Sequence, residues 1–242
     1  MLLDAIRYDY GLSEMIMMVV AAAVVVLLTL PIHEWAHGFV STKLGDPTPR
    51  MQGRLTLNPM AHIDWIGALG ILLVGIGWAK PVQVNARYYK YPKWGMALTA
   101  LAGPLSNLIM AFFSIFIYFL VMSILWSTGL LYDASEWIVY MYAFFDMVAS
   151  INIALAIFNL IPLPPFDGSR ILFTFLPQKY YFKIMQYEQF IFIGVLVLLC
   201  SRVLDSTLKM INDSIFENIV KIAALPFNLI LDIDMTYFMF WL

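Results

Sequence analysis

Two histidines and a glutamate form the motif His33-Glu34-Trp35-Ala36-His37, whose residue types and spacing can support metal chemistry. Residues four positions apart share one face of a helix, so both imidazoles can bind the same ion. This HExxH spacing is typical of helices that bind zinc, with the glutamate acting on water at the metal. The chain has three histidines, and two of them are in this motif. We therefore predict metal ligation by His33 and His37, with Glu34 handling protons outside the ligand set.

The composition indicates a membrane protein. The chain is 62% hydrophobic and 12% charged, with a mean hydropathy of +0.82, whereas soluble domains are about 25% charged. The 242 residues are enough for a bundle of several spans, but leave no room for a large additional soluble domain. The net charge of −2 gives no indication of nucleic-acid binding, and the single cysteine cannot form an internal disulfide. The sequence leaves the oligomeric state open.

Apolar segments predict an all-α polytopic membrane protein, a transmembrane helix bundle with a short re-entrant or β-hairpin element on its cytosolic side. The apolar run at 66–78 is too short for a span of about 20 residues, and Arg54-Leu55-Thr56-Leu57 alternates as a strand does. Interleaved polar residues make the tail amphipathic or membrane-associated. The expected division is an interfacial segment at 1–14, a transmembrane core at 15–204 and a tail at 205–242. Within the core, we expect spans at about 15–40, 94–126, 136–161 and 189–204, and the re-entrant or β region at 50–85.

Positive charge predicts the orientation of these spans. Seven lysines and arginines lie between residues 41 and 93, whereas the loop at 127–135 has none. By the positive-inside rule the first of these segments faces the cytosol and the second faces outward. The HExxH motif then lies toward the cytosolic end of the first span of a multi-pass cell-membrane protein.

A third metal ligand is expected, because catalytic zinc usually has three protein ligands and one open position. The segment NLIPLPPFDG at 159–168 reaches the same depth as the two histidines and contains Asp167. Its three prolines prevent a regular helix, and non-helical backbone at membrane depth must be buried in protein or line a wet cavity. On its own, Asp167-Gly168 would be better explained as an ordinary turn. The prolines and the shared depth favour ligation by Asp167.

Three motifs in order make the chain resemble the site-2 protease family of intramembrane zinc proteases, in its short bacterial form without an inserted PDZ or regulatory domain. They are HEWAH at 33–37, GPLSN at 103–107 and NLIPLPPFDG at 159–168. The resemblance implies one zinc ion per chain held by His33, His37 and Asp167, with Glu34 as catalytic base. It also implies that Asn159 stabilises the oxyanion or holds the substrate backbone. Its expected partners are transmembrane protein substrates and the lipid bilayer.

Several residues have a simpler structural explanation. Asn159 could cap the broken helix, and Gly103 to Asn107 is better explained by close helix packing than by chemistry. We interpret Asp146 as structural, and we expect His62 to make a local hydrogen bond, although it could also gate the site. Arg54-Leu55-Thr56-Leu57 could be a plain hairpin or an edge that pairs with substrate.

Two other functions compete with intramembrane proteolysis. A non-proteolytic zinc-binding scaffold or a transporter subunit is the alternative from another class, but a transporter would be expected to have paired broken helices in internal repeats. Only one broken segment is visible, around Pro162. A prenyl-protein protease is a second enzymatic alternative. Such proteins resemble a different arrangement of motifs, in which the third ligand is a later glutamate and not the aspartate of Asp-Gly.

Overall fold

The computed structural model describes residues 3, 11–74, 77–130, 135–201 and 203–240. Residues 1–2 and 4–10 of the predicted interfacial segment at 1–14 lie outside them, and residues 12–14 belong to the first described helix. The described part is helical, and four of its helical segments are long and apolar enough to cross a membrane, which makes this a multi-pass membrane protein. They are Leu12–Lys43, Pro92–Ser127, Trp137–Asn159 and Asp205–Leu231.

The first long rod consists of α2 (Leu12–Val24), a single π-helical turn η1 (Val25–Thr29) and α3 (Leu30–Lys43). Proline has no N–H, so Pro31 cannot donate to the carbonyl of Leu27 one turn earlier. The hydrogen-bond ladder widens at this point, and the N–H of Leu30 donates to the carbonyl of Val25 five residues earlier. The wide turn lies immediately before the HExxH motif.

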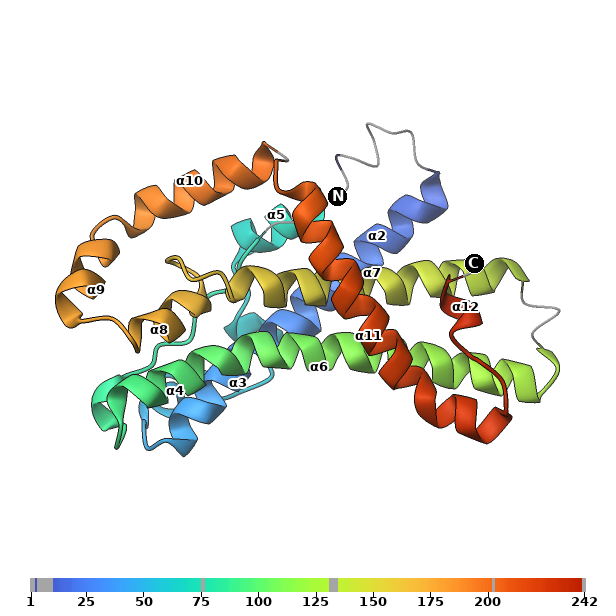
Figure 1. The fold of residues 1–242 in the computed structure, drawn as a ribbon, viewed down its shortest axis with the longest axis horizontal. Helices are drawn as coiled ribbons and strands as arrows, with labels where there is room; N and C mark the ends of the chain where they lie inside the picture. Colours follow the sequence, from blue (N-terminus) through green and yellow to red (C-terminus); the bar gives the residue numbers. More distant parts are fainter. Residues whose placement is uncertain (1–2, 4–10, 75–76, 131–134, 202, 241–242) are drawn as a thin grey trace.

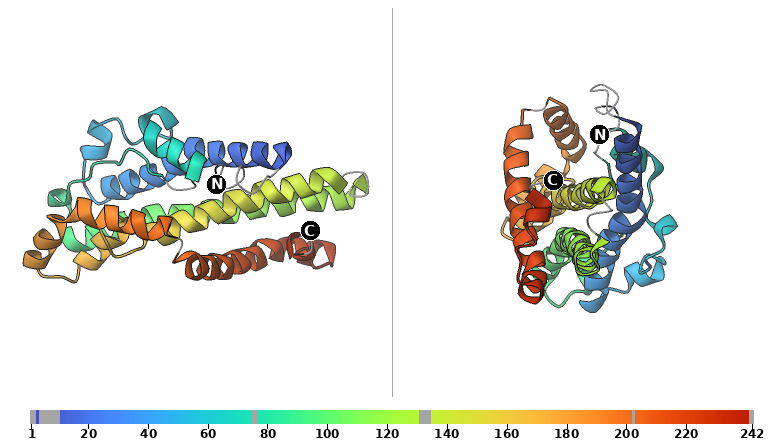
Figure 2. Two further views of the ribbon diagram at one scale, coloured as in Figure 1. Left: turned by 90° about the horizontal axis from the view of Figure 1, so that it is seen from above. Right: turned by 90° about the vertical axis from the view of Figure 1, so that its right-hand side faces the viewer.

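The core of the bundle is formed by α6 (Pro92–Ser127) and α7 (Ser135–Asn159), which lie side by side in both figures (Figure 1 and Figure 2). Helix α11 (Asp205–Leu231) crosses both of them obliquely (Figure 1). Apolar side chains from the three helices pack into one buried cluster that includes Ile115, Phe119, Ile153 and Val220. A second cluster, around Val25 and Ile71, joins the first rod to α7.

Shorter elements connect the long helices. They are α4 (Thr48–Met51), η2 (Pro59–Ala61), α5 (Trp65–Val74), η3 (Ala86–Tyr88), α8 (Asp167–Phe173), α9 (Gln178–Met185) and α10 (Glu188–Cys200). The chain closes with α12 (Tyr237–Phe240).

The predicted β-hairpin is wrong, because no strand occurs among the described residues. Local hydrogen bonds in the 50–58 segment explain why. Gly53 turns the chain with a φ of 65°, and the side chain of Asn58 accepts from the N–H of Met60 to begin η2. The carbonyl of Thr56, which a strand partner would use, faces the His62 Nε2 at 2.8 Å. Most of the ten-residue helix α5 lies in the 66–78 run, and the described residues of this run give no support for a re-entrant element.

The fourth span-length helix is α11 rather than the 189–204 segment. Helix α10 has 13 residues, so it extends about 20 Å and is shorter than a hydrocarbon core of ~30 Å. Helix α11 has 27 residues. One of its polar side chains contacts the bundle, because Asn212 donates to the carbonyl of Ser150 on α7, whereas others, such as Glu217 and Lys221, are exposed. The division of the chain into domains stays a prediction.

Candidate metal centre

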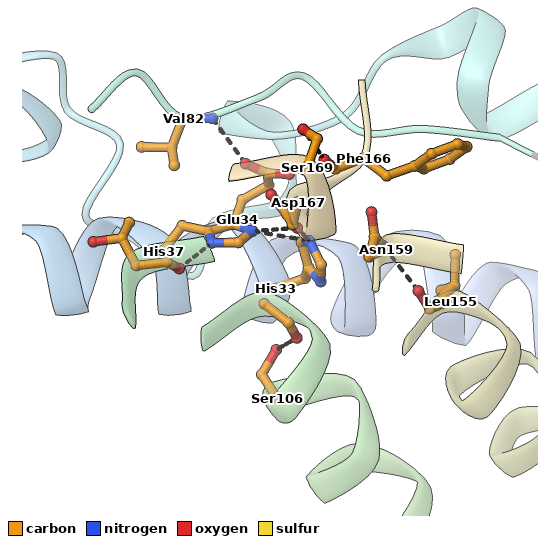
Figure 3. Close-up of polar contacts among 12 residues, drawn as sticks. His33, Glu34, His37, Val82, Ser106, Leu155, Asn159, Phe166, Asp167 and Ser169 are labelled. Atoms are coloured by element: carbon orange, nitrogen blue, oxygen red, sulfur yellow. Dashed lines mark hydrogen bonds and ion pairs between the residues drawn. The ribbon is translucent and has the colours of Figure 1, made fainter. Parts of the chain in front are cut away.

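The two histidines of the HExxH motif lie on the inner face of α3, one helical turn apart (Figure 3). His33 and His37 are 6% and 5% exposed, so both imidazoles are buried. Their Nε2 atoms are 3.0 Å apart. Two ring nitrogens this close repel each other through their lone pairs unless a proton or a metal ion lies between them. The helix therefore presents a pair of convergent donor atoms.

Asp167 completes the group from the other side. It is the first residue of α8, directly after the proline-rich turn. Its Oδ2 lies 3.3 Å from His33 Nε2 and 3.1 Å from His37 Nε2. These three residues form a group that could hold a metal ion. The sequence predicted this trio, and the structure brings it together.

The spacing of the three donor atoms fits zinc. With bonds of about 2.0–2.1 Å, two ligand atoms of a tetrahedral zinc site lie about 3.3–3.4 Å apart. The three separations of 3.0, 3.1 and 3.3 Å are close to that value. Two imidazoles and one carboxylate are also a usual ligand set for catalytic zinc, which needs one open position. The residues present therefore fit one zinc ion.

The carboxyl of Asp167 is held in the form that binds metals. Burial alone would raise its pKa, but attraction to His37 and hydrogen bonds from both histidines hold the pKa well below its usual range. Asp167 is therefore ionised at neutral pH. A carboxylate, rather than a carboxylic acid, is the species that binds a divalent cation.

A backbone carbonyl sets the protonation of His37. The Nδ1 atom of His37 lies 2.7 Å from the carbonyl oxygen of Thr99 on α6. Since a carbonyl can only accept, Nδ1 carries the hydrogen and leaves the Nε2 lone pair for a metal. The Nδ1 atom of His33 has no protein partner in the described residues.

A buried polar chain holds Thr99 in turn. The Thr99 hydroxyl lies 3.2 Å from the hydroxyl of Tyr89, which lies 2.8 Å from that of Ser41. Ser41 donates to Asp46, and Asp46 also accepts from the backbone N–H groups of Thr48 and Asn85. This chain connects the end of α3, the loop at 44–47 and the loop before α6 to the residue that orients His37.

Glu34 lies beside this group of three residues but is not part of it. Its side chain is 7% exposed, and its Oε2 accepts a hydrogen bond of 2.8 Å from the backbone N–H of Val82 (Figure 3). Its Oε1 has no hydrogen-bond partner in the described part of the chain. The loop at 78–85 therefore fixes the direction of a carboxylate that keeps one free oxygen.

Asn159 is the last residue of α7, at the end that approaches His33 and Asp167 (Figure 3). Its Nδ2 donates to the carbonyl of Leu155 within the same helix, at 2.9 Å. This bond is the helix-end interaction that the sequence offered as its simpler explanation. An amide nitrogen carries two hydrogens, so one donor remains.

Two glycines allow the close packing of this centre. A Cβ at Gly103 would overlap His37 Nε2 and His33 Cε1, and one at Gly168 would overlap the backbone of Leu160 and Ile161. Gly103 of the GPLSN motif thus lets α6 pack closely against the two histidines, in agreement with the explanation by helix packing. His62 and Asp146 do not belong to the ligand group; His62 makes the expected local contact with Thr56.

The sequence did not reveal the N–H of Val82 or the carbonyl of Thr99 as site groups. A backbone group occurs at every position, so it carries no residue-type signal.

Comparison with known proteins identifies the family. Residues 21–201 match the model of peptidase family M50. The chain belongs to peptidase family M50. This M50 member is 40% identical over 218 residues to YwhC of Bacillus subtilis (strain 168), which its name assigns to the zinc metalloproteases. That alignment covers 86% of this chain and 93% of YwhC.

A more distant relative is Rip2 of Mycobacterium tuberculosis (strain ATCC 25618 / H37Rv), also assigned by name to the zinc metalloproteases. It is 27% identical over 184 residues, which cover 74% of this chain and 66% of Rip2. No solved structure matches this M50 chain significantly. The predicted resemblance to the site-2 proteases is confirmed.

Proposed function

We propose that this chain is a zinc-dependent endopeptidase that hydrolyses peptide bonds within or beside the transmembrane segments of other membrane proteins. The convergence of His33, His37 and Asp167 beside Glu34 carries this proposal. Membership of peptidase family M50 and the four span-length helices support it. A transporter or scaffold is not favoured by any of these observations.

His33, His37 and Asp167 would hold one zinc ion through Nε2, Nε2 and Oδ2. When bound, zinc supplies Lewis-acid activation of water and of a peptide carbonyl at neutral pH. The Thr99 carbonyl keeps the His37 tautomer that can ligate. The buried position of the imidazoles keeps bulk water away from the ligand bonds.

Glu34 acts as the general base and then as the general acid in this proposal. Its Oε1 takes a proton from the attacking water and later gives a proton to the leaving amine. The N–H of Val82 holds Oε2 and thereby keeps the carboxylate pointing in one direction. A fixed base needs no reorganisation during the reaction.

Asn159 stabilises the charge that develops on the scissile carbonyl oxygen. The hydrogen that Nδ2 does not give to Leu155 is available to that oxygen. A donor placed in this way is worth about 2.7–4 kcal/mol of barrier lowering in other acyl-transfer sites.

The site faces the cytosolic side in this proposal, because seven lysines and arginines lie in residues 41–93, directly after the span that ends with the HExxH motif. Labelling tests this orientation. In a Cys200→Ala background, a cysteine at Thr128 should react with an impermeant reagent added outside intact cells, and one at Lys90 should react only after lysis. The reverse pattern would place the site on the outer side.

The substrate is a transmembrane helix of another protein. Its carbonyls are hydrogen-bonded within the helix, so it must unwind before hydrolysis. Glycine or proline near the cleaved bond costs a helix ~1 or ~3 kcal/mol relative to alanine, so either residue makes opening easier. Replacing such residues with leucine should slow cleavage.

Metal content and cleavage, measured together, test the function. The purified protein should contain about one zinc per chain and lose both the zinc and its activity on chelation. Glu34→Gln should keep the zinc and abolish cleavage of co-expressed single-span proteins, whereas His33→Ala should lose both. Cleavage by Glu34→Gln at the parent rate would disprove the protease assignment.

A further inference from the structure

A cavity of about 480 Å³ opens next to the metal centre. Its walls come from the extended segment at 81–84, the first turn of α6, the proline turn at 164–165, α8 and the segment that leads to α10. These are parts of the chain far apart in sequence. The cavity is large enough for one or two amino-acid side chains, and none of the proposed metal ligands forms its wall.

The wall of the cavity includes residues from the segments that hold the proposed catalytic groups. Val82, whose N–H holds Glu34, forms part of its wall. Ser169, two residues after Asp167, forms another part. A peptide whose scissile bond lies between Glu34 and Asp167 can therefore extend into this cavity with the residues that flank the bond.

The charges around the cavity are predominantly positive. Lys93 and Arg170 contribute cations, and Glu188 contributes the single carboxylate. In the part of the chain that the structure describes, neither cation forms an ion pair. Lys93 also lies in the first turn of α6, whose start has no side-chain cap, and the start of a helix has a partial positive charge.

Arg170 is the cation best placed for recognition. It is only partly exposed, in contrast to Lys93, which is exposed. A half-buried guanidinium without a partner loses hydration that a carboxylate can replace through two parallel hydrogen bonds. Much of the remaining wall, including Val82, Met96 and Phe173, is apolar, and apolar surroundings strengthen such a pair.

We propose that this cavity is a specificity subsite that binds an acidic side chain of the substrate, close to the scissile bond, through Arg170 with help from Lys93. The inference rests on the proposed proteolytic function and adds a substrate preference to it. The occupant is an aspartate or glutamate of the peptide being cut. Glu188 limits the preference, because it reduces the positive potential of the cavity.

A scan of substrate charge tests the subsite. A single-span substrate that the purified holoenzyme cleaves receives Asp, Asn or Lys at each position within about six residues on either side of the cut. We expect one or two positions at which Asp raises kcat/KM about tenfold over Asn, and at which Lys lowers it. Equal rates for Asp, Asn and Lys at every position would overturn the subsite, while cleavage itself would leave the proposed function intact.

Enzyme variants assign the effect to Arg170. Arg170→Gln should bring the Asp-to-Asn ratio of kcat/KM close to one, and Arg170→Glu should favour Lys over Asn at the same position. Glu188→Gln should raise the Asp-to-Asn ratio. The matched control is Lys179→Gln, because Lys179 is exposed on α9 and outside the cavity wall, and it should keep the parent ratio. Zinc content is measured for each variant. If the Arg170 variants do not fold, Lys93→Gln tests the same cavity and should lower the Asp-to-Asn ratio.

Varying the lipid composition distinguishes an acidic peptide side chain from a lipid headgroup, which is a second source of negative charge for the cavity. The same assays are run in vesicles of phosphatidylcholine alone and in vesicles with added phosphatidylglycerol. A substrate-charge preference that is equal in both supports the subsite. An Arg170-dependent rate that follows the phosphatidylglycerol content and ignores the substrate charge would show that a lipid headgroup occupies the cavity, and would overturn the proposal.

Discussion

Gly103 of α6 packs directly against the imidazole of His37. A Cβ at this position would overlap His37 Nε2 and His33 Cε1. Helix α6 can therefore approach α3 closely only because residue 103 has no side chain. The same approach places the Thr99 carbonyl, one turn earlier on α6, against His37 Nδ1. One glycine thus permits both the position and the tautomer of a proposed ligand.

Gly103→Ala should therefore displace the histidines and reduce zinc binding. We expect zinc content well below one per chain and loss of most cleavage, with the protein still inserted in the membrane. Gly194→Ala is the matched control, because a Cβ at Gly194 meets no atom within 4 Å, and it should be neutral. Full zinc occupancy in Gly103→Ala would show that the two helices can separate without cost to the site.

The two aspartates that the sequence contrasted should behave differently. Asp167→Ala removes the oxygen, one of the three atoms proposed to bind zinc, so zinc affinity and proteolysis should both be lost. Asp146→Asn should keep both, with at most lower stability, because Asp146 lies outside the ligand group. Metal analysis of the two purified variants checks this. Zinc retained in Asp167→Ala and lost in Asp146→Asn would move the third ligand to α7.

The group of His33, His37 and Asp167 was predictable because its constraints are local or are visible in the sequence. Helical spacing alone brings His33 and His37 together. The prolines before Asp167 predict a broken helix at membrane depth, where a backbone carbonyl without a hydrogen bond is costly if it faces lipid. The predicted trio forms a group with three mutual separations of 3.0 to 3.3 Å.

Other features were not predictable from residue type. The strand expected at Arg54–Leu57 does not form, because His62 takes the Thr56 carbonyl, and alternation in four residues cannot reveal such a competitor. Helix α11 looked interfacial because charges interrupt it. Its buried face, with Phe216, Val220 and Ala223, packs on the other helices, and partners such as the Ser150 carbonyl become visible only in the folded bundle.

Asp46 should make stability dependent on pH. Burial alone would raise its pKa, but hydrogen bonds from Thr48, Asn85 and Ser41 outweigh burial and lower the pKa below its usual value. A lowered pKa means that the contribution to stability is complete above the unfolded-state pKa of about 3.9 and is lost as pH falls through the folded-state pKa.

Asp46→Asn should therefore destabilise the protein by about 1–3 kcal/mol near pH 7, and the difference from the parent should shrink below about pH 4. Thermal unfolding in detergent at several pH values measures both effects. Glu217→Gln is the control, because Glu217 is exposed and paired with Lys221 on the same helix, and such pairs contribute about 0.3–0.5 kcal/mol. A constant difference at all pH values would show that the charge of Asp46 is not what stabilises the fold.

The backbone N–H of Val82 should be needed for fast cleavage. It donates to Glu34 Oε2 at 2.8 Å and is the group that fixes the proposed base. Val82→Pro removes the donor, because proline has no N–H. A hydrogen bond to a charged group is worth about 1.5–3 kcal/mol, so kcat should fall by roughly ten- to a hundredfold. Zinc content should stay at one per chain, because neither residue is a ligand.

Val82→Ala keeps the N–H and removes only the side chain, so it should lose much less activity than Val82→Pro. The two variants are compared by kcat, KM and zinc content on one substrate. Equal kcat values for both variants, with zinc retained, would show that the orientation of Glu34 does not depend on this bond.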